Sequence, residues 1–366
     1  MPRRFWIVVV TVAAAVLVVQ LAGTHATAWH FFELAADLLF GSGPTGDRSG
    51  LRLYGDHPEL QFGPTSILVA APFTLLGGAA GELLAMTFMS LLGIGVVWMI
   101  LDVVDDAGSR PAPAPSVGHW VIAITLVVTW GDIAARTAHI DDAIAITALV
   151  AGIHRMRHDR PVAATLLFAL AAAAKPWAVV FVPLCALPWQ PGSWRRPALA
   201  AGIAVATWIP FIVAEPDTLD TSEFGIVNDP TSSLRALGID AATTPGWVRP
   251  VQLVGGLVVV SLLVLRNRWP AAILAGISWR LLLDPGVHRY YTVGFVVGAV
   301  LVESRIRPGR PPWFTIAGAL VLEITAMPGA PVLIGQATRL GVLVVALAAA
   351  LGHPALSPAA DPASAR

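Results

Sequence analysis

The sequence predicts an all-α protein, a polytopic bundle of transmembrane helices, and three observations carry that prediction. Of its 366 residues, 56% are hydrophobic and only 13% are charged, and the mean hydropathy is +0.73. Apolar runs approaching the ~20 residues that cross a bilayer recur along the whole chain. The formal net charge is zero, so no basic excess is available to neutralise the phosphates of a nucleic acid, and we expect no such partner. The single cysteine, Cys185, excludes a disulfide framework and a thiolate metal site.

The amino-terminal segment is predicted to be an uncleaved first helix. The basic residues Arg3 and Arg4 precede an apolar run at 5–23, about one full span, with no small-residue cleavage site after it. By the positive-inside rule these arginines place the amino terminus in the cytoplasm. We therefore expect a multi-pass protein of the plasma membrane.

Residues 24–63 form a predicted first outer loop. Within it, residues 29–40 carry apolar side chains at helical spacing and end at Gly41, a pattern that predicts an amphipathic helix lying on the membrane surface. The loop also holds side chains that suit acid–base chemistry: His30, Glu33, Asp37, Asp47, Asp56, His57 and Glu59.

The apolar runs after the first helix predict about 11–13 membrane segments in all, some of them half-spans. They lie at 64–77, 83–101, 118–131, 141–153, 161–174, 177–188, 198–214, 250–265, 270–283, 290–302, 313–327 and 331–350. The runs 64–77 and 118–131 each make roughly 21 Å of helix, short for a hydrocarbon core of roughly 30 Å. Full crossings by every run before Asp141 would place that residue on the cytoplasmic side. We therefore expect one of the two short runs to be a half-span or re-entrant.

Charge patterning separates two sides of the bundle. The basic clusters alternate with acidic or neutral connections, and we assign them to the cytoplasm: 155–160, 195–196, 266–268 and 305–310. The turn at 139–142, Lys175, a second outer loop at 215–249 and the segment 284–289 then fall on the outer side. Residues 1–350 are expected to form a single transmembrane domain. The tail at 351–366, rich in Ala, Pro and Ser, is expected to be disordered.

The stretch 137–177 combines two acids and a lysine around one hairpin. Asp141 and Asp142 begin an apolar segment, where a helix dipole favours carboxylates, but capping needs only one of them. Ionisable residues at membrane depth are costly and usually line a cavity or path. The second segment of the hairpin returns to Lys175, the sole lysine, at about the depth of the acids. Lys175 either snorkels to the interface or acts as a point charge for a phosphate.

A further polar cluster lies at 280–291. Two arginines, a histidine and two tyrosines at an outer boundary suit an anionic headgroup: Arg280, His288, Arg289, Tyr290 and Tyr291. The alternative is local, because Arg280 and Asp284 are four residues apart and can pair on one helix face.

These features together resemble the polytopic glycosyltransferases of the GT-C fold. The resemblance rests on the first helix, the long loop with its interfacial helix, the acid-headed span, the basic turn and the Ala-rich segment ending in Lys175 and Pro176. Within that group the chain is most similar to the bacterial, actinobacterial-type mannosyltransferase-like family that uses polyprenol-phosphate sugars. The likeness covers 29–64 and 137–183, with weaker support at 284–291.

The resemblance implies an inverting transfer of a mannose-like sugar from a polyprenol-phosphate donor to an envelope glycolipid or glycan acceptor on the outer face, next to membrane lipids. It implies a general base in the first outer loop, donor-phosphate ligands, acids lining the site, and acceptor or headgroup contacts. The resemblance assigns the base to Asp56, His30 or Asp37, and the donor-phosphate ligands to Lys175, Arg280 and Arg289. Asp141 and Asp142 would line the site. His139, His288 and Tyr291 would contact the acceptor or the headgroup. The resemblance requires no particular metal, although a divalent ion is compatible with the acids.

One departure from the family bears on activity. Relatives usually carry an aspartate directly after the first helix, whereas this chain has Ala28, Trp29 and His30 there. Glu33, Asp37, Asp56 or His30 would then serve as the base, or the chain has no transferase activity. The alternatives are therefore a catalytically inactive, lipid-binding relative and a polytopic transporter. The gathering of charges at one face argues against the transporter.

Overall fold

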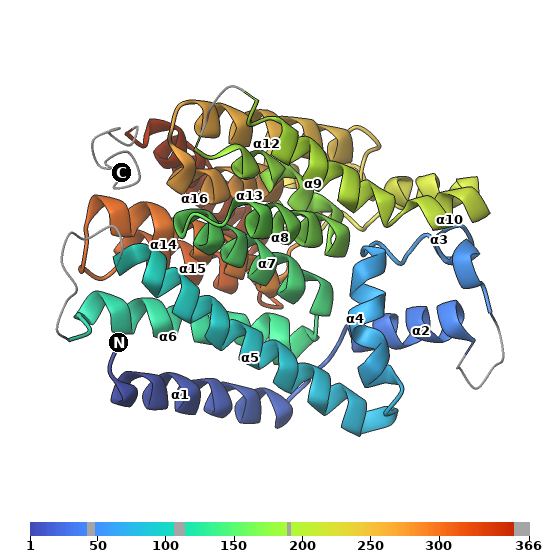
Figure 1. Ribbon diagram of the computed structural model, residues 1–366, viewed down its shortest axis with the longest axis horizontal. Coiled ribbons are helices and arrows are strands. Elements are labelled where there is room, and N and C mark those ends of the chain that lie inside the picture. The colour runs from blue at the N-terminus through green and yellow to red at the C-terminus, as the bar shows by residue number, and fades with distance from the viewer. Residues whose placement is uncertain (42–47, 106–113, 189–191, 355–366) are drawn as a thin grey trace.

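The computed structural model describes residues 1–41, 48–105, 114–188 and 192–354, and its architecture is a bundle of helices lying side by side (Figure 1). Within these ranges the only strand-like pairing is an isolated antiparallel bridge between Val227 and Thr243. The predicted all-α class is confirmed over this part of the chain.

Five of the described helices are long and apolar enough, by length and composition, to cross a membrane. They are α1 (Arg3–Leu21), α5 (Gly78–Asp105), α6 with the π-helical turn η2 (Val117–Thr137), α12 (Val248–Leu265) and α16 (Val332–Gly352). Shorter apolar helices are α4 (Pro64–Thr74), α8 (Pro161–Ala174), the 3₁₀ helix η3 (Pro176–Ala186) and α15 (Trp313–Thr325). The remaining α-helices are α2 (Trp29–Phe40), α3 (Leu53–Asp56), α7 (Ile140–Arg157), α9 (Arg195–Ala206), α10 (Ile209–Ala214), α11 (Ser233–Ala236), α13 (Ala272–Leu282) and α14 (Thr292–Ile306). Short 3₁₀ turns are η1 (Gly50–Arg52), η4 (Pro216–Glu223), η5 (Trp269–Ala271) and η6 (Arg289–Tyr291). The chain is a helical membrane protein.

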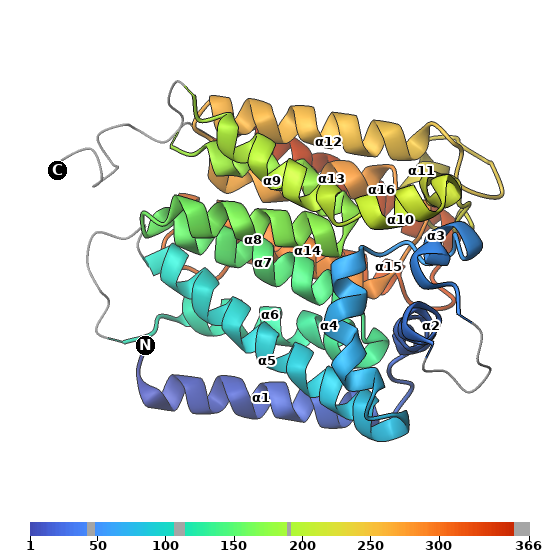
Figure 2. The same ribbon diagram turned by 45° about the vertical axis from the view of Figure 1, so that its right-hand side comes forward.

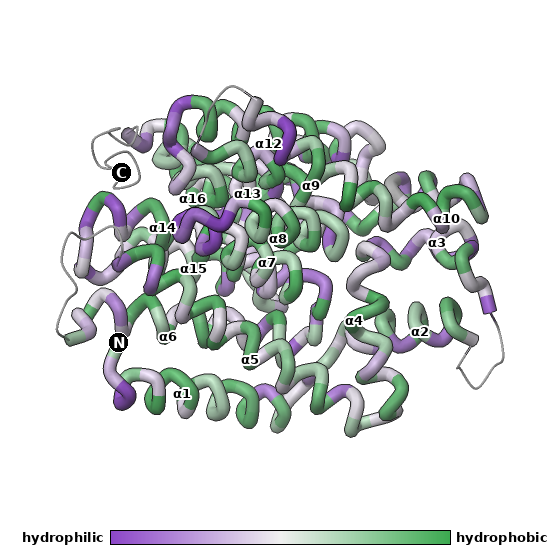
Figure 3. The backbone as a smooth tube through the Cα atoms, in the orientation of Figure 1, coloured by the Kyte–Doolittle hydropathy of each residue, from purple (hydrophilic) through white to green (hydrophobic). Residues whose placement is uncertain are grey.

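Most of the long helices run between two ends of the bundle (Figure 2). We call the end where α7 finishes and α8 begins the His154 end, and the end where α7 begins and α8 finishes the Lys175 end. At the His154 end, His119 contacts Asp105, and Arg268 donates to the carbonyl of Leu351. At the Lys175 end, the segment before α2 meets the turn that precedes α7, where the N–H of Ala28 donates to the carbonyl of Thr137 at 2.8 Å. Hydrophilic residues gather towards the helix ends, with apolar residues between them (Figure 3). The two groups of charges separated by the sequence pattern therefore lie at different ends of the fold.

The short runs 64–77 and 118–131 differ in how they fold. The second is α6, which continues through η2 as a helix of 21 residues, roughly 30 Å long. The first is α4, with 11 residues, roughly 16 Å, and it stands across the direction of its neighbours (Figures 1 and 2). The N–H of Gly63, just before α4, donates to the carbonyl of Ala174 at the Lys175 end. Of the two runs, 64–77 is therefore the one whose helix is shorter than a membrane span.

Three other boundaries differ from the sequence pattern. The run 198–214 is two helices, because Pro210 at the start of α10 has no N–H with which to continue α9. The run 177–188 is the 3₁₀ helix η3, which contains Pro183. Leu351, at the start of the expected disordered tail, belongs to α16, and residues 355–366 lie outside the described residues.

The two outer loops pack on each other at the Lys175 end. The hydroxyl of Thr221 donates to the carbonyl of Tyr54, and Nη2 of Arg249 donates to Oε1 of Gln61 at 2.9 Å. The guanidinium of Arg52 lies 3.3 Å from the carboxylate of Glu215. The predicted helix at 29–40 is confirmed as α2, which ends at Gly41 with a left-handed φ of 70°.

At the His154 end, α14 and α15 are joined by a buried carboxylate. Both oxygens of Glu303 in α14 accept backbone N–H groups at the start of α15, from Phe314 at 3.1 Å and Thr315 at 3.0 Å. The side chain of Thr315 adds a third hydrogen bond. Glu303 therefore caps a helix other than its own, where the helix dipole favours a negative charge.

Candidate functional site

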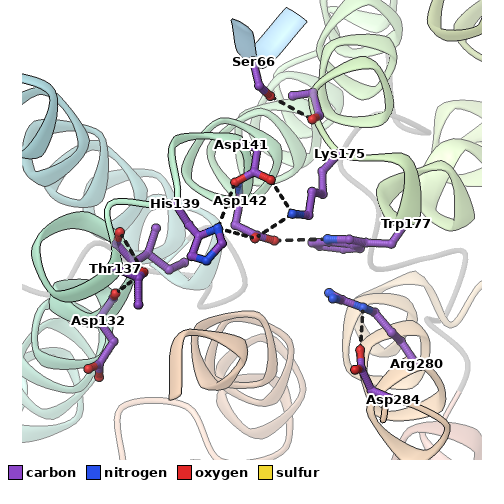
Figure 4. Close-up of polar contacts among 12 residues, drawn as sticks. Ser66, Asp132, Thr137, His139, Asp141, Asp142, Lys175, Trp177, Arg280 and Asp284 are labelled. Carbon is purple, nitrogen blue, oxygen red and sulfur yellow. Dashed lines mark hydrogen bonds and ion pairs between the residues drawn. The ribbon is translucent and has the colours of Figure 1, made fainter. Parts of the chain in front are cut away.

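Two buried carboxylates at the start of α7 form the centre of the candidate site (Figure 4). The chain enters α7 through the π-helical turn η2 and through Ala138, which has a left-handed φ of 54°. Asp141 and Asp142 then occupy the first turn and are 0% and 2% exposed. The Oδ1 of Asp141 accepts the N–H of Asp142 at 2.8 Å, which fixes one carboxylate against the helix end.

Lys175 neutralises part of this charge from the end of α8. Pro176 disfavours helical backbone at the residue before it, and Lys175 is accordingly extended, with φ −141° and ψ 114°. Its ammonium donates to Oδ2 of Asp141 and lies 3.3 Å from Oδ2 of Asp142 (Figure 4). The predicted return of the chain to the depth of the acids is confirmed. Two carboxylates face one ammonium, so the trio carries one negative charge when all three are ionised.

His139 and Trp177 complete the surroundings of the acid pair. Nδ1 of His139 lies 3.4 Å from Oδ1 of Asp141, and Nε1 of Trp177 donates to Oδ1 of Asp142 at 3.1 Å. Oδ2 of Asp142 is buried and accepts no hydrogen bond, although the Lys175 ammonium is its ion-pair partner. This oxygen of Asp142 therefore has unused hydrogen-bonding capacity.

A narrow pocket of about 10 Å³, room for roughly one water molecule, lies beside Asp142 and is also lined by Arg280. The guanidinium of Arg280 lies 4.7 Å from the ring centre of Trp177 and 4.6 Å from that of Tyr291. Its Nε is 3.5 Å from Oδ2 of Asp284, so the local pairing expected from their spacing also forms. The pocket is lined by Asp142, Ile146, Trp177, Ile277, Arg280, Leu281, Tyr290, Tyr291 and Gly294.

His288 borders the aromatic wall of this pocket. Its ring stacks on that of Tyr290, with ring centroids 5.2 Å apart. The ring centroid of His139 lies 4.1 Å from that of Tyr290. Burial lowers the pKa of His288, which lies in the loop between α13 and α14. The imidazole is therefore neutral at pH 7 and can both donate and accept a hydrogen bond.

Arg289, expected beside Lys175 and Arg280, lies in a separate ionic group. Its Nε donates to Oε2 of Glu323 at 2.6 Å and lies 3.6 Å from Oδ1 of Asp132. Arg136 also faces Asp132, at 3.9 Å. This group joins η2, η6 and α15. Arg289 thus has two carboxylate partners of its own, and no residue of this group lines the pocket.

The three candidate bases of the first outer loop lie apart from the acid pair. Asp56 is exposed, with Arg52 at 3.4 Å, and His30 is exposed with its ring against Phe31 at 4.0 Å. Asp37 is half-buried in the last turn of α2. Asp47 lies outside the described residues. Within the described part of residues 24–63, Phe32 makes the ring contact with His139, with ring centroids 6.5 Å apart. No described residue of this loop lines the pocket.

Of the expected acceptor or headgroup contacts, His139, His288 and Tyr291 all lie at the acid pair or the pocket wall. Residues that the sequence pattern did not single out also contribute. Trp177 bridges Asp142 and Arg280, and Arg339 of α16 is 1% exposed, with Nε and Nη2 lacking hydrogen-bond partners. In the sequence, Arg339 and Glu323 each lie inside an apolar run, and a charge in such a run indicates a candidate site residue.

His139, Asp141 and Asp142 could also hold a metal ion, since one donor atom from each lies within 4.8 Å of the others. The ammonium of Lys175 contacts both carboxylates and competes for the same oxygens. The acid pair therefore has a cation of its own, and a divalent ion would have to displace it.

Comparisons of the chain with models of protein families, with curated proteins and with solved structures found no match. The function is therefore argued from the geometry of the site.

Proposed function

We propose that the chain is an integral-membrane glycosyltransferase of the GT-C type, which moves a mannose-like sugar from a polyprenol-phosphate donor to a glycolipid or glycan acceptor. One observation carries the proposal: Asp142 and Arg280 line the same narrow pocket as Trp177, Tyr290 and Tyr291, a pocket that must widen to admit a sugar. Aromatic walls suit a sugar ring, a guanidinium suits a phosphate, and a carboxylate suits a hydroxyl proton.

The proposed reaction is a single displacement. The acceptor hydroxyl oxygen forms a bond to the anomeric carbon while the bond from that carbon to the phosphate oxygen breaks. The electron pair leaves with the polyprenyl phosphate, whose charge Arg280 stabilises, and the hydroxyl proton passes to Oδ2 of Asp142. The Lys175 ammonium contacts both carboxylates and offsets part of their negative charge.

The base in this proposal is Asp142, since the first-loop candidates do not line the pocket. Oδ2 of Asp142 accepts no hydrogen bond, although the Lys175 ammonium lies 3.3 Å away, so an incoming hydroxyl would meet an unused acceptor there once the pocket widens. Asp56, by contrast, is exposed and faces Arg52. The two carboxylates therefore provide a matched pair of variants for testing where the base lies.

The membrane arrangement belongs to the same proposal. We place the amino terminus and the His154 end in the cytoplasm and the Lys175 end on the outer face of the plasma membrane, with about 11–13 membrane segments if half-spans are included. In this arrangement α2 lies along the outer membrane surface. The donor phosphate then reaches Arg280 at the headgroup level.

The test is a transfer assay with the purified chain in lipid vesicles and polyprenol-phosphate mannose as the probe donor. Asp142→Asn is expected to lower the transfer rate by about 10²-fold or more, as for loss of a general base, with the KM for the donor little changed. Lys175→Ala is expected to lower the rate as well. Asp56→Asn, the control, is expected to retain the wild-type rate.

Two outcomes would contradict this assignment. Full activity of Asp142→Asn together with loss of activity in Asp56→Asn would move the base to the first outer loop. If the wild-type chain binds polyprenyl phosphate but forms no glycosidic product, the chain is the inactive, lipid-binding relative. The absence of an aspartate directly after α1 favours that second candidate.

A further inference from the structure

Three metal-ligating side chains converge at the His154 end, far along α7 from the acid pair. Nε2 of His158 lies 2.9 Å from Oδ2 of Asp102, and Nε2 of His154 lies 3.1 Å from the same oxygen. The donor atoms of the three residues all lie within 4.8 Å of one another. Helices α5 and α7, which supply them, pack side by side (Figures 1 and 2).

The local sequence explains this convergence. His154 and His158 are four residues apart at the end of α7, so both rings leave the helix on one face. Their ring centroids are 4.4 Å apart. Asp102 lies in the last turns of α5, and Trp98, one turn earlier, packs its ring against His154 at 5.0 Å. A buried imidazole held by Trp98 fixes one donor in place, while the other two adjust around it.

The distances suit a single ion. In a tetrahedral site with metal–nitrogen and metal–oxygen distances of about 2.0–2.2 Å, donor atoms stand roughly 3.3 Å apart. The two distances to Asp102 are 2.9 and 3.1 Å, within a few tenths of an ångström of that value, and the two imidazole donors lie within 4.8 Å of each other. Without an ion, both imidazoles must donate to one carboxylate oxygen. With an ion, each imidazole presents a lone pair from Nε2 and carries its proton on Nδ1.

We propose that Asp102, His154 and His158 bind one divalent transition-metal ion of the zinc type, with a water molecule completing the coordination. Two imidazole nitrogens and one carboxylate favour Zn²⁺, Co²⁺ or Ni²⁺ over Mg²⁺ and Ca²⁺, which prefer oxygen ligands. The side chains of Asp102 and His158 are 40% and 48% exposed, so the ion can enter from solvent. His154 is 5% exposed and anchors the site.

The site is independent of the proposed transferase activity, because it lies at the other end of the bundle. It differs from the group of His139, Asp141 and Asp142, where the Lys175 ammonium already contacts both carboxylates. Around Asp102 the described contacts include no such competing lysine or arginine ion pair. A bound ion would fasten the end of α5 to the end of α7.

The experiment uses the full chain purified in detergent and stripped with a chelator. Titration with Co²⁺, followed by its visible absorption, and with Zn²⁺, followed by calorimetry, is expected to show one equivalent bound. His158→Ala and Asp102→Asn are expected to weaken binding by about tenfold or more, as loss of a ligand removes one of three protein–metal bonds. His119→Ala is the matched control, since His119 lies at the same end and, among the described residues, pairs with one carboxylate, that of Asp105, at 2.6 Å.

Replacement of the buried His154 can disturb folding, so the exposed His158 carries the test. The proposal is overturned if the wild-type chain binds no Zn²⁺ or Co²⁺, or if His158→Ala and Asp102→Asn bind as the wild type does. It is also overturned if His139→Ala abolishes binding while His158→Ala does not, because the ion would then lie at the acid pair. Loss of binding in His119→Ala alone would likewise place it elsewhere.

Discussion

At the scale of single residues, the ion pair of Lys175 with Asp141 dominates the site. Both side chains are largely buried, and the ammonium also lies 3.3 Å from Asp142. A buried charge is tolerated when its partner is present, and removing one partner leaves the other uncompensated. The lysine is therefore required for the acids to remain together, whatever reaction they serve.

Lys175→Met tests this dependence. We expect it to lower the free energy of unfolding by about 3–5 kcal/mol, the usual effect of breaking a buried ion pair. Adding Asp141→Asn to the same chain is expected to restore part of that loss, because the second change removes the uncompensated charge. Thermal unfolding in detergent measures both. Equal stability of the wild type and Lys175→Met would show that the pair contributes nothing to folding.

Residue types alone indicated part of this site. The acids at the head of an apolar run and the lysine before Pro176 were sufficient to predict a polar group at one end of the hairpin. The partner of Arg289 could not be predicted, because Glu323 is 34 residues away and only the packing of α15 brings it to 2.6 Å. In the same way, the exposure of Asp56 depends on how α3 turns, which its neighbours in sequence do not determine.

At the scale of helices, the contact between α4 and α8 controls how the first outer loop sits on the site. The N–H of Gly63 donates to the carbonyl of Ala174 at 2.9 Å, and the hydroxyl of Ser66 donates to the same oxygen at 2.8 Å. Ala174 directly precedes Lys175. The start of α4 is therefore fastened to the backbone that presents the ammonium.

Gly63→Ala should separate these two segments. A Cβ at this position would lie 1.8 Å from the carbonyl oxygen of Ala173, so the backbone of α4 or α8 must move. We expect a lower thermal unfolding midpoint and, under the proposed function, a lower transfer rate. Gly95→Ala in α5 is the control, since a Cβ there meets nothing within 4 Å. Identical midpoints for the two variants would mean that the close contact does not form.

The helix pattern was predictable where local chemistry marks the ends. Gly41 ends α2 as expected, and Pro161 begins α8 after the basic turn. The π-helical turn at Asp132–Thr137 was not predictable, because it extends α6 by backbone bonding rather than by composition. The extension of α6 through η2 and the short length of α4 explain why the runs 64–77 and 118–131, which have equal length in the sequence, form helices of different length.

At the scale of the whole molecule, the two ends of the bundle should face different compartments. Cys185 is fully buried, so the wild-type chain offers an impermeant maleimide no exposed thiol among the described residues. Asp240→Cys places a thiol at the Lys175 end, where the side chain is 87% exposed, and Arg310→Cys places one at the His154 end.

In intact cells we expect the maleimide to label Asp240→Cys and to leave Arg310→Cys unlabelled until the membrane is permeabilised. Labelling measured by a gel shift distinguishes the two. Labelling of both variants in intact cells would place the ends on one side, and the reverse pattern would invert the proposed orientation. The wild type serves as the background control.

The carboxylate of Glu303 has a consequence for how the chain is made. Its hydrogen-bond donors belong to α15, so α14 cannot satisfy this buried charge while α15 is still inside the ribosome. Until residues 314 and 315 have been made, this carboxylate lacks all three of its donors and depends on water at the His154 end. We therefore expect α14 to reach its final position only when α15 docks on it and supplies these hydrogen bonds.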